Sequence, residues 1–218
     1  MAWPVTPYIG GERVVVTSPL AFIRKAEHVR RDGRVAMLVG GVHVRGNAEV
    51  RADASGDGFV ADYLQQELRK YPPARTLVKV PLHRKLFAWY FGRGIMSFAP
   101  ERVATRAGDD TATLITLDAD GFPSIVPIAV AEAPAGVFAV GTESGEGAAC
   151  MLIHRETADM SDLRSLLVRG DIAAGTFTVR SRVGSLDAPA SDEGEFARRR
   201  RARAATRLMR DWPQARDG

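Results

Sequence analysis

Short apolar runs separated by glycine-containing turns dominate the first half of the chain, and several alternate between apolar and polar positions. This pattern is typical of antiparallel β-strands. Gly10-Gly11 stands between the first two runs, where a tight hairpin turn needs residues that tolerate a positive φ. The pattern predicts strands at residues 5–9, 13–17, 34–39, 42–50 and 95–98.

Two segments of the first half carry apolar residues at helical spacing instead. The first begins at Ser18-Pro19 and ends near Arg31, because a serine hydroxyl caps free N–H groups and proline suits the first helical position. The second spans residues 59–71 and ends at Pro72-Pro73, since proline cannot continue a helix. We expect both helices to lie beside the predicted strands.

A second series of strands follows a polar linker at residues 108–110. It consists of residues 112–117, 124–130, 137–141, 148–154, 163–172 and 176–183. Residues 188–194 are small and polar, which indicates a linker, and residues 196–212 are predicted to form a basic helix. The expected fold is therefore mainly β, a barrel of antiparallel strands with peripheral helices, divided into residues 1–106, 107–187 and a helical tail at 188–218.

The second series resembles the first. Residues 36–39 (AMLV) correspond to 150–153 (CMLI), and residues 44–46 (VRG) recur unchanged at 168–170. Residues 5–8 (VTPY) correspond to 125–128 (IVPI). Since any two amphipathic strands look alike, the order of the matches carries the argument. It indicates an internal duplication of a small barrel.

Composition excludes several classes of protein. Of the 218 residues, 45% are hydrophobic and 26% are charged, which argues against wholesale disorder. Cys150 is the single cysteine, so an intramolecular disulfide and a cysteine-clustered metal site are both excluded. No apolar run approaches the length of a membrane-spanning helix, and the N-terminus lacks the features of a signal peptide. We expect a cytoplasmic protein with no membrane partner.

The net charge of +4 is concentrated at the C-terminal end. From residue 196 onward there are eight arginines against two aspartates, so this segment carries +6 and the rest of the chain −2. A uniformly basic nucleic-acid-binding protein is not expected. The arginine run has three interpretations: a solvated helix face, contact with nucleic acid or an anionic surface, or neutralisation of an acidic coenzyme tail.

One stretch resembles a known family. Residues 12–50 comprise a strand, Thr17-Ser18, a helix with Arg24-Lys25, a strand beginning at Arg34, and a strand with a central glycine. In this order the chain resembles the FMN-binding split barrels, which include pyridoxamine 5'-phosphate oxidase and the deazaflavin-dependent reductases. Residues 100–103 are similar to the closing strand of that family, and residues 118–130 to its opening hairpin. The resemblance implies a tandem of two split barrels.

The resemblance also implies a cofactor site. A flavin phosphate carries close to two negative charges, so it needs cations together with hydroxyl or amide donors. The family positions that bind the phosphate correspond to Thr17, Ser18, Arg24 and Lys25, and the strand that borders the flavin ring corresponds to Val5, Thr6 and Pro7. Taken alone, Arg24-Lys25 would be a solvated helix face. The cofactor implied is FMN or a deazaflavin, and haem held by His83 or His154 ranks third.

The implied function is that of an oxidoreductase that transfers a hydride between the flavin and a small-molecule acceptor. The C-terminal arginine and histidine with which the oxidase holds its substrate have no full counterpart, because no histidine follows His154. The second copy lacks an Arg-Lys helix, which suggests one cofactor per chain in an intrachain pseudo-dimer, with a homodimer as the other arrangement. No catalytic residue stands out, and the four histidines do not have the spacing of a metal site. The alternative function is a non-catalytic flavin- or haem-binding protein or sensor.

Overall fold

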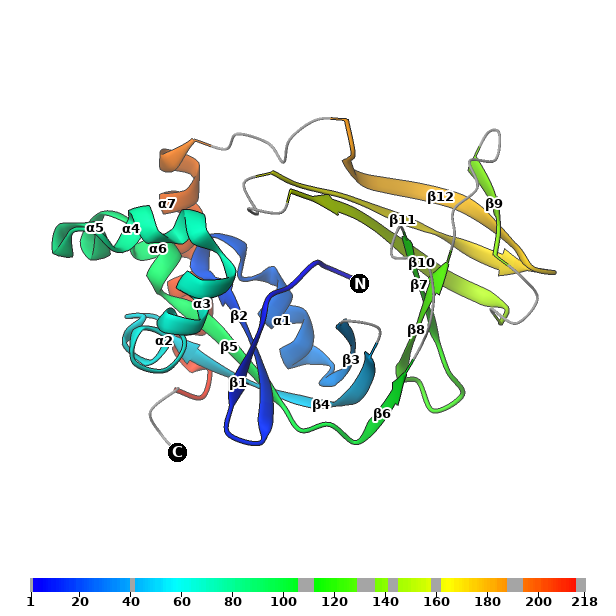
Figure 1. Cartoon of the computed structure of the whole chain (residues 1–218), viewed down its shortest axis with the longest axis horizontal. Helices are drawn as coiled ribbons and strands as arrows, with labels where there is room; N and C mark the ends of the chain where they lie inside the picture. Colours follow the sequence, from blue (N-terminus) through cyan, green and yellow to red (C-terminus); the bar gives the residue numbers. More distant parts are fainter. Residues whose placement is uncertain are drawn as a thin grey trace.

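Two antiparallel sheets with helices packed against the first make up the computed structural model of the chain (Figure 1). The structure describes residues 2–39, 42–105, 112–128, 136–140, 145–157, 162–187 and 194–214. The expectation of a mainly β fold with peripheral helices is confirmed at this level. The linker expected at 108–110 and most of the one expected at 188–194 lie outside the described residues.

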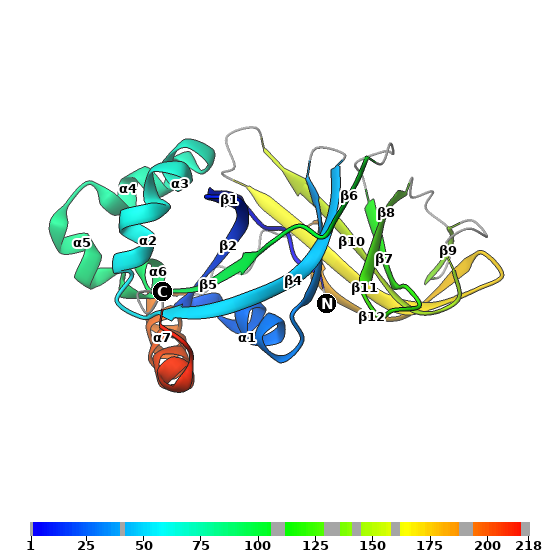
Figure 2. The ribbon, with the colours of Figure 1, turned by 90° about the horizontal axis from the view of Figure 1, so that it is seen from below.

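The first sheet has the strand order β1-β2-β5-β4-β3, with β6 also paired to β4. Its strands are β1 (Pro7–Gly10), β2 (Arg13–Pro19), β3 (Arg34–Val39), β4 (Val42–Asp53), β5 (Arg93–Phe98) and β6 (Arg102–Thr105). Strand β4 pairs with β3 along one edge, and with β6 and then β5 along the other. Figure 2 shows β4 running as one long strand from the helical side towards the second sheet, so that this sheet curls.

A helical insertion joins β4 to β5 and forms one end of the molecule (Figure 1). It comprises α2 (Asp57–Asp62), α3 (Leu64–Lys70), the 3-10 turn η2 (Pro72–Ala74), α4 (Arg75–Val78), α5 (Pro81–Leu86) and α6 (Ala88–Phe91). Asp53 fixes its start, because its carboxylate accepts the backbone N–H groups of Gly56 at 3.0 Å and Phe59 at 2.7 Å. The single helix predicted over residues 59–71 is in fact two helices, separated at Tyr63.

The helix predicted to start at Ser18-Pro19 begins later than expected. Strand β2 continues through Pro19, a 3-10 turn η1 (Leu20–Phe22) follows, and α1 spans Arg24–Arg31. The Ser18 hydroxyl does not cap the helix: it donates a hydrogen bond to the Phe22 carbonyl at 2.7 Å. The prediction of an N-terminal cap is wrong because the serine side chain is used as a donor one turn before α1.

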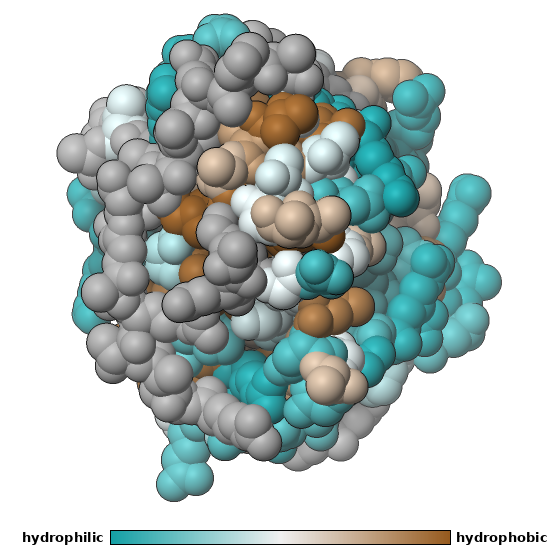
Figure 3. All heavy atoms as spheres, turned by 90° about the vertical axis from the view of Figure 1, so that its right-hand side faces the viewer, coloured by the Kyte–Doolittle hydropathy of each residue, from teal (hydrophilic) through white to brown (hydrophobic). Residues whose placement is uncertain are grey.

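The second sheet has the order β8-β7-β10-β11-β12-β9. Its strands are β7 (Ala112–Leu117), β8 (Pro123–Ile128), β9 (Val137–Ala139), β10 (Gly147–Glu156), β11 (Leu163–Ala173) and β12 (Thr176–Ser185). A two-residue turn joins β11 to β12, where Ala174 and Gly175 both have positive φ angles, of 48° and 72°. Figure 3 faces the end of the molecule formed by this sheet and shows apolar surface between polar side chains.

Four strands of each sheet share one arrangement. The order β2-β5-β4-β3 in the first sheet corresponds to β9-β12-β11-β10 in the second. Register agrees as well, since Ala36 pairs with Arg45 as Cys150 pairs with Arg169. The match between residues 5–8 and 125–128 is not reproduced, because β1 pairs with β2 whereas β8 pairs with β7. This agreement between the sheets covers the two hairpins that the sequence repeat identified.

The C-terminal helix α7 (Glu195–Leu208) and the following 3-10 turn η5 (Met209–Asp211) pack against the first sheet's core. Ala202, Ala205, Met209 and Trp212 are buried there, and Leu208 is 41% exposed. The chain then returns to β4, where the Ala52 N–H donates to the Pro213 carbonyl at 2.6 Å. The segment expected as a basic tail therefore contributes to the first core. None of the described helices has the length and hydropathy needed to cross a bilayer.

Candidate functional site: a cleft between the two sheets

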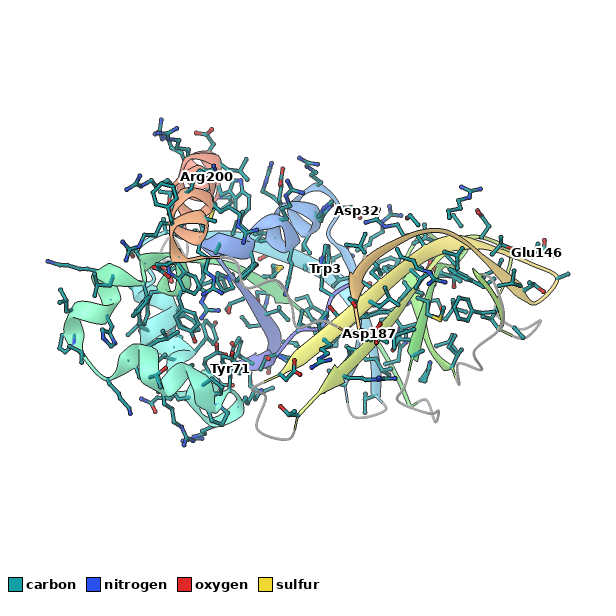
Figure 4. All side chains as sticks on the ribbon, turned by 90° about the horizontal axis from the view of Figure 1, so that it is seen from above. Trp3, Asp32, Tyr71, Glu146, Asp187 and Arg200 are labelled. Atoms are coloured by element: carbon teal, nitrogen blue, oxygen red, sulfur yellow. The ribbon has the colours of Figure 1, made fainter. Side chains whose placement is uncertain are left out.

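A cleft of about 840 Å³ lies between the first and second sheets. Volumes of this size are typical of small-molecule and cofactor sites. The N-terminal arm, residues 2–6, runs into the space between the sheets, and Figure 4 shows Trp3 at this central position. The walls of the cleft come from the arm, α1, β2, β3 and β5 on one side, and from β7, β8 and β10 on the other. The cleft is therefore built from residues far apart in the sequence.

Lys25 supplies a cation to the α1 wall of the cleft. The lysine is half-buried, and its Nζ donates to the Pro4 carbonyl at 3.4 Å. Burial lowers the pKa of Lys25 below its ordinary value, and the positive charge of Arg93 lowers it further. No carboxylate pairs with Lys25 among the described residues. An anionic ligand group would relieve this charge.

The N-terminal arm contacts the same wall through an aromatic pair. The rings of Trp3 and His28 lie 5.6 Å apart between centroids and are tilted by 39°. His28 lies three residues after Lys25 on α1, so both side chains reach the cleft from one helix face. The arm and α1 together enclose this part of the cleft.

Asp32 and Arg34 form an ion pair where α1 passes into β3. The Arg34 guanidinium donates to both carboxylate oxygens of Asp32, with Nε–Oδ1 and Nη2–Oδ2 distances of 2.9 and 2.7 Å. This arginine lowers the pKa of Asp32 to about 2, chiefly through the side-chain hydrogen bonds. Arg34 Nη1 also donates to the Asp120 carbonyl at 3.4 Å, across to the second sheet. Both side chains are engaged with each other, so Lys25 is the more available charge.

The opposite wall is mainly apolar. Alternate residues of three strands of the second sheet face the cleft, as the period of two in a strand requires. They are Thr113, Ile115 and Leu117 of β7, Pro123, Ile125 and Pro127 of β8, and Leu152 and His154 of β10. His154 is the one titratable side chain that this wall contributes to the described lining. A flat apolar ring can pack against such a surface.

A buried polar cluster lies on the other face of β2. Glu67 of α3 accepts hydrogen bonds from the hydroxyls of Tyr8 and Tyr90, the latter at 2.8 Å, and lies 3.6 Å from Arg93 Nη2. Arg93 is 2% exposed and donates to Thr17 Oγ1 at 3.1 Å. Burial and the adjacent Glu67 charge raise the pKa of both tyrosines. This cluster connects the helical insertion to the sheet.

Stacking supplements the ion pair of Arg93. Its guanidinium carbon lies 3.8 Å from the centroid of the Phe59 ring and 4.5 Å from that of the Tyr90 ring. Its Nε nevertheless has no hydrogen-bond acceptor among the described residues. A buried guanidinium held mainly by rings and one carboxylate therefore adds positive potential on the side of Lys25.

The seven residues that the family resemblance singled out do not converge on one site. Val5 and Lys25 line the cleft, whereas Thr6 and Pro7 are half-buried beside it. Thr17 belongs to the buried cluster, and the Ser18 hydroxyl donates its hydrogen bond to the Phe22 carbonyl. Arg24 is exposed and is not part of the cleft lining.

Sequence reasoning missed several residues that the structure brings together. Arg93, Glu67 and Tyr8 meet although they are separated by up to 85 positions. The one local signal was Gly92-Arg93-Gly94, a lone cation between glycines after an aromatic run. His154 was noted only as a haem-ligand alternative, yet it lines the cleft.

Comparison of the chain with family models, with curated proteins and with solved structures found no match. The resemblance to the split barrels therefore stays a prediction, and the geometry of the cleft carries the functional argument.

Proposed function

We propose that the chain binds a flavin-type cofactor, FMN or a deazaflavin, in the cleft between the sheets and acts as an oxidoreductase on a small molecule. The observation that carries this proposal is Lys25, a half-buried cation without a carboxylate partner among the described residues, beside a mainly apolar cleft of about 840 Å³. FMN and deazaflavins share a flat, largely apolar ring system and an anionic phosphate. The cleft offers a complementary surface to each part.

The residues present fit such a group. Lys25 would hold the phosphate, with the positive potential of Arg93 behind it. The apolar side chains of β7, β8 and β10 would pack against the ring, and Val5 would border it. When bound, a flavin supplies hydride transfer, and FMN also permits one-electron steps. The protein's part is to bind, to orient and to exclude water.

Two imidazoles could serve proton transfer. His28 and His154 line opposite walls of the cleft. Asp32 is held by Arg34 and its pKa is about 2, so it stays ionised at neutral pH and is a poor proton donor. A reduced acceptor that needs a proton would therefore receive it from a histidine ring nitrogen. One cleft of this size lies between the two sheets in the part of the chain that the structure describes, which supports one cofactor per chain.

The proposal is tested by adding FMN or a deazaflavin to the purified chain and measuring the dissociation constant from flavin fluorescence. We expect one site per chain. Lys25→Ala should weaken binding about 10- to 100-fold, which is the range for loss of a charge-assisted hydrogen bond. Lys79→Ala is the matched control, because this lysine is exposed and does not line the cleft.

Two outcomes would contradict the proposal. If neither FMN nor a deazaflavin binds, the proposed cofactor is ruled out. If Lys25→Ala and Lys79→Ala weaken binding equally, the proposed site at Lys25 is ruled out. Arg24→Ala separates the cleft from the family motif, since this exposed side chain should matter less than Lys25. Stoichiometric binding without catalysed reoxidation by any acceptor would favour the non-catalytic flavin-binding function.

A further inference from the structure

The later part of the helical insertion is cationic. Residues 68–91 contain six lysines and arginines and no aspartate or glutamate, whereas Asp57, Asp62 and Glu67 stand in the earlier part. All six cationic residues are exposed: Arg69, Lys70, Arg75, Lys79, Arg84 and Lys85. An uninterrupted run of one sign produces a positive surface potential and attracts anionic partners.

Apolar side chains project from the same place. Val80, Leu82 and Leu86, in α5 and just before it, are 46%, 59% and 41% exposed. Figures 1 and 2 show that α4 and α5 form the outermost end of the molecule on the side away from the second sheet. We call residues 75–86 the α4–α5 end. Three large exposed apolar side chains at a protruding end of the molecule indicate a surface that contacts an apolar partner.

Little of this charge is neutralised within the chain. Arg84 pairs with Asp57, and Arg75 Nε donates to the Leu68 carbonyl at 3.1 Å. Lys79 and Lys85 have no carboxylate partner in the part of the chain that the structure describes. The positive potential of the α4–α5 end therefore remains available to a partner.

The arginine-rich helix α7 adjoins this end. Arg199 Nη2 donates to the Leu86 carbonyl at 3.2 Å, and Arg198 stacks on Trp89 with 5.1 Å between the guanidinium carbon and the ring centroid. Arg200 on α7 is exposed and is labelled in Figure 4. The cationic surface thus continues from the insertion onto α7.

We propose that the α4–α5 end docks the protein on an anionic lipid bilayer, with Val80, Leu82 and Leu86 at the acyl–headgroup boundary and Lys79 and Lys85 among the headgroups. Mixed apolar and cationic side chains are the composition of interfacial helices. Nucleic acid matches the charge but offers no apolar layer to Leu82. A rigid protein would need a groove for this convex end, whereas a fluid bilayer adapts to it. The proposal departs from the expectation of no membrane partner. It needs no transmembrane segment, because the contact is confined to the bilayer surface.

The test is co-sedimentation of the full chain with vesicles of phosphatidylcholine containing about one third phosphatidylserine, compared with phosphatidylcholine alone. We expect binding to the anionic vesicles only, and weaker binding at high salt. A cation near such a surface contributes about fivefold to the partition coefficient, so Lys79→Gln with Lys85→Gln should reduce it about 25-fold. Leu82→Ser should reduce it about fivefold with all charges kept.

The control is Arg182→Gln with Val183→Ser on β12, where both side chains are also exposed. It should change binding by less than about twofold. The proposal is overturned by equal binding to neutral vesicles, or by a control as defective as the lysine variant. It is also overturned if a DNA duplex binds with the same lysine dependence while Leu82→Ser leaves vesicle binding unchanged. Because the assay needs no flavin, its result is independent of the proposed cofactor.

Discussion

At the residue scale, the cluster around Arg93 places a full positive charge where water does not reach. Glu67 is its ion-pair partner at 3.6 Å, and the carboxylate also accepts the hydroxyls of Tyr8 and Tyr90. Removal of one member of a buried pair leaves the other without compensation, which costs more than the pair itself contributes. Neutralisation of Glu67 should therefore cause a large loss in the free energy of unfolding.

Glu67→Gln should lower the free energy of unfolding by about 3–5 kcal/mol, because the Arg93 guanidinium would stay buried without a carboxylate. Urea denaturation followed by circular dichroism measures this. Glu49→Gln is the control: its carboxylate is 63% exposed beside Arg13, and loss of a surface pair costs about 0.2–1 kcal/mol. Similar losses in the two variants would show that the buried pair is not essential to stability.

Lys25 should make stability depend on pH. Its pKa in the folded chain lies below 10.5, so over the window between the lowered pKa and 10.5 the unfolded chain binds more protons. The stability of the wild type relative to Lys25→Met should therefore rise as pH rises through this window towards 10.5. Paired urea melts at pH 7 and at pH 10 measure the difference. If the pH dependence measured with Lys25→Met is the same as that measured with the exposed-lysine control Lys79→Met, the cleft does not desolvate the Lys25 amine.

Only part of the site could be predicted from single residues. Lys25 was singled out through the resemblance to the split barrels, and the structure places it at the cleft. Thr17 and Ser18 could not both serve that cleft, because consecutive residues of a strand point to opposite faces. Arg93 was missed because its burial depends on Glu67 and two rings that come from other elements.

At the element scale, the close approach of α1 to β5 depends on Gly94. A Cβ at this position would lie 2.7 Å from the Ala26 Cβ and 2.8 Å from Ile23 Cδ1. Both partners are buried, so neither can move into solvent. A glycine is needed here for space.

Gly94→Ala should therefore lower the free energy of unfolding by about 1–3 kcal/mol through overpacking. Combination with Ala26→Gly supplies the control, because that change removes the atom that the new methyl group meets. The double variant should lose less stability than the sum of the two single losses, measured by thermal denaturation of all four proteins. Strict additivity would show that the contact does not limit how closely α1 packs.

Elements were predicted where the pattern is local. Alternation located the strands to within a few residues, since a half-buried strand repeats every two positions. The break at Tyr63 escaped prediction because apolar positions continue at helical spacing through it. Residues 75–78 received no element in advance, although they form α4.

At the scale of the whole molecule, Arg45 of β4 connects the two sheets. Its guanidinium pairs with Asp118 and, at 3.1 Å, with Asp120, and it stacks 5.1 Å from the centroid of the Phe122 ring. The side chain is 11% exposed, so these pairs are partly shielded from water. They hold the turn between β7 and β8 against the first sheet.

Arg45→Met should free this turn while each sheet keeps its own core. We expect a loss of about 1.5–3 kcal/mol and faster amide hydrogen exchange at Asp118 and Gly121. Exchange mass spectrometry with Arg13→Met as the exposed control measures both effects. Unchanged exchange at the turn would show that other contacts hold the sheets together.

The arrangement of the two sheets was predictable only in outline. The sequence repeat of residues 36–46 at 150–170 corresponds to two observed hairpins, β3–β4 and β10–β11. It could be recognised because a hairpin joins strands that are neighbours in sequence. The pairing of β7 with β10 and of β9 with β12 joins strands that are distant in sequence, and no local pattern encodes it. The cleft likewise depends on how the sheets face each other.

The position of α7 has a consequence for biosynthesis. Ala202, Ala205, Met209 and Trp212 close a core that is otherwise built from the first half of the chain. A nascent polypeptide that has emerged only as far as the second sheet would thus carry an unfinished apolar surface. We expect this surface to remain open to chaperones until α7 and η5 have emerged, so that the first sheet completes its core only after the second sheet has been made.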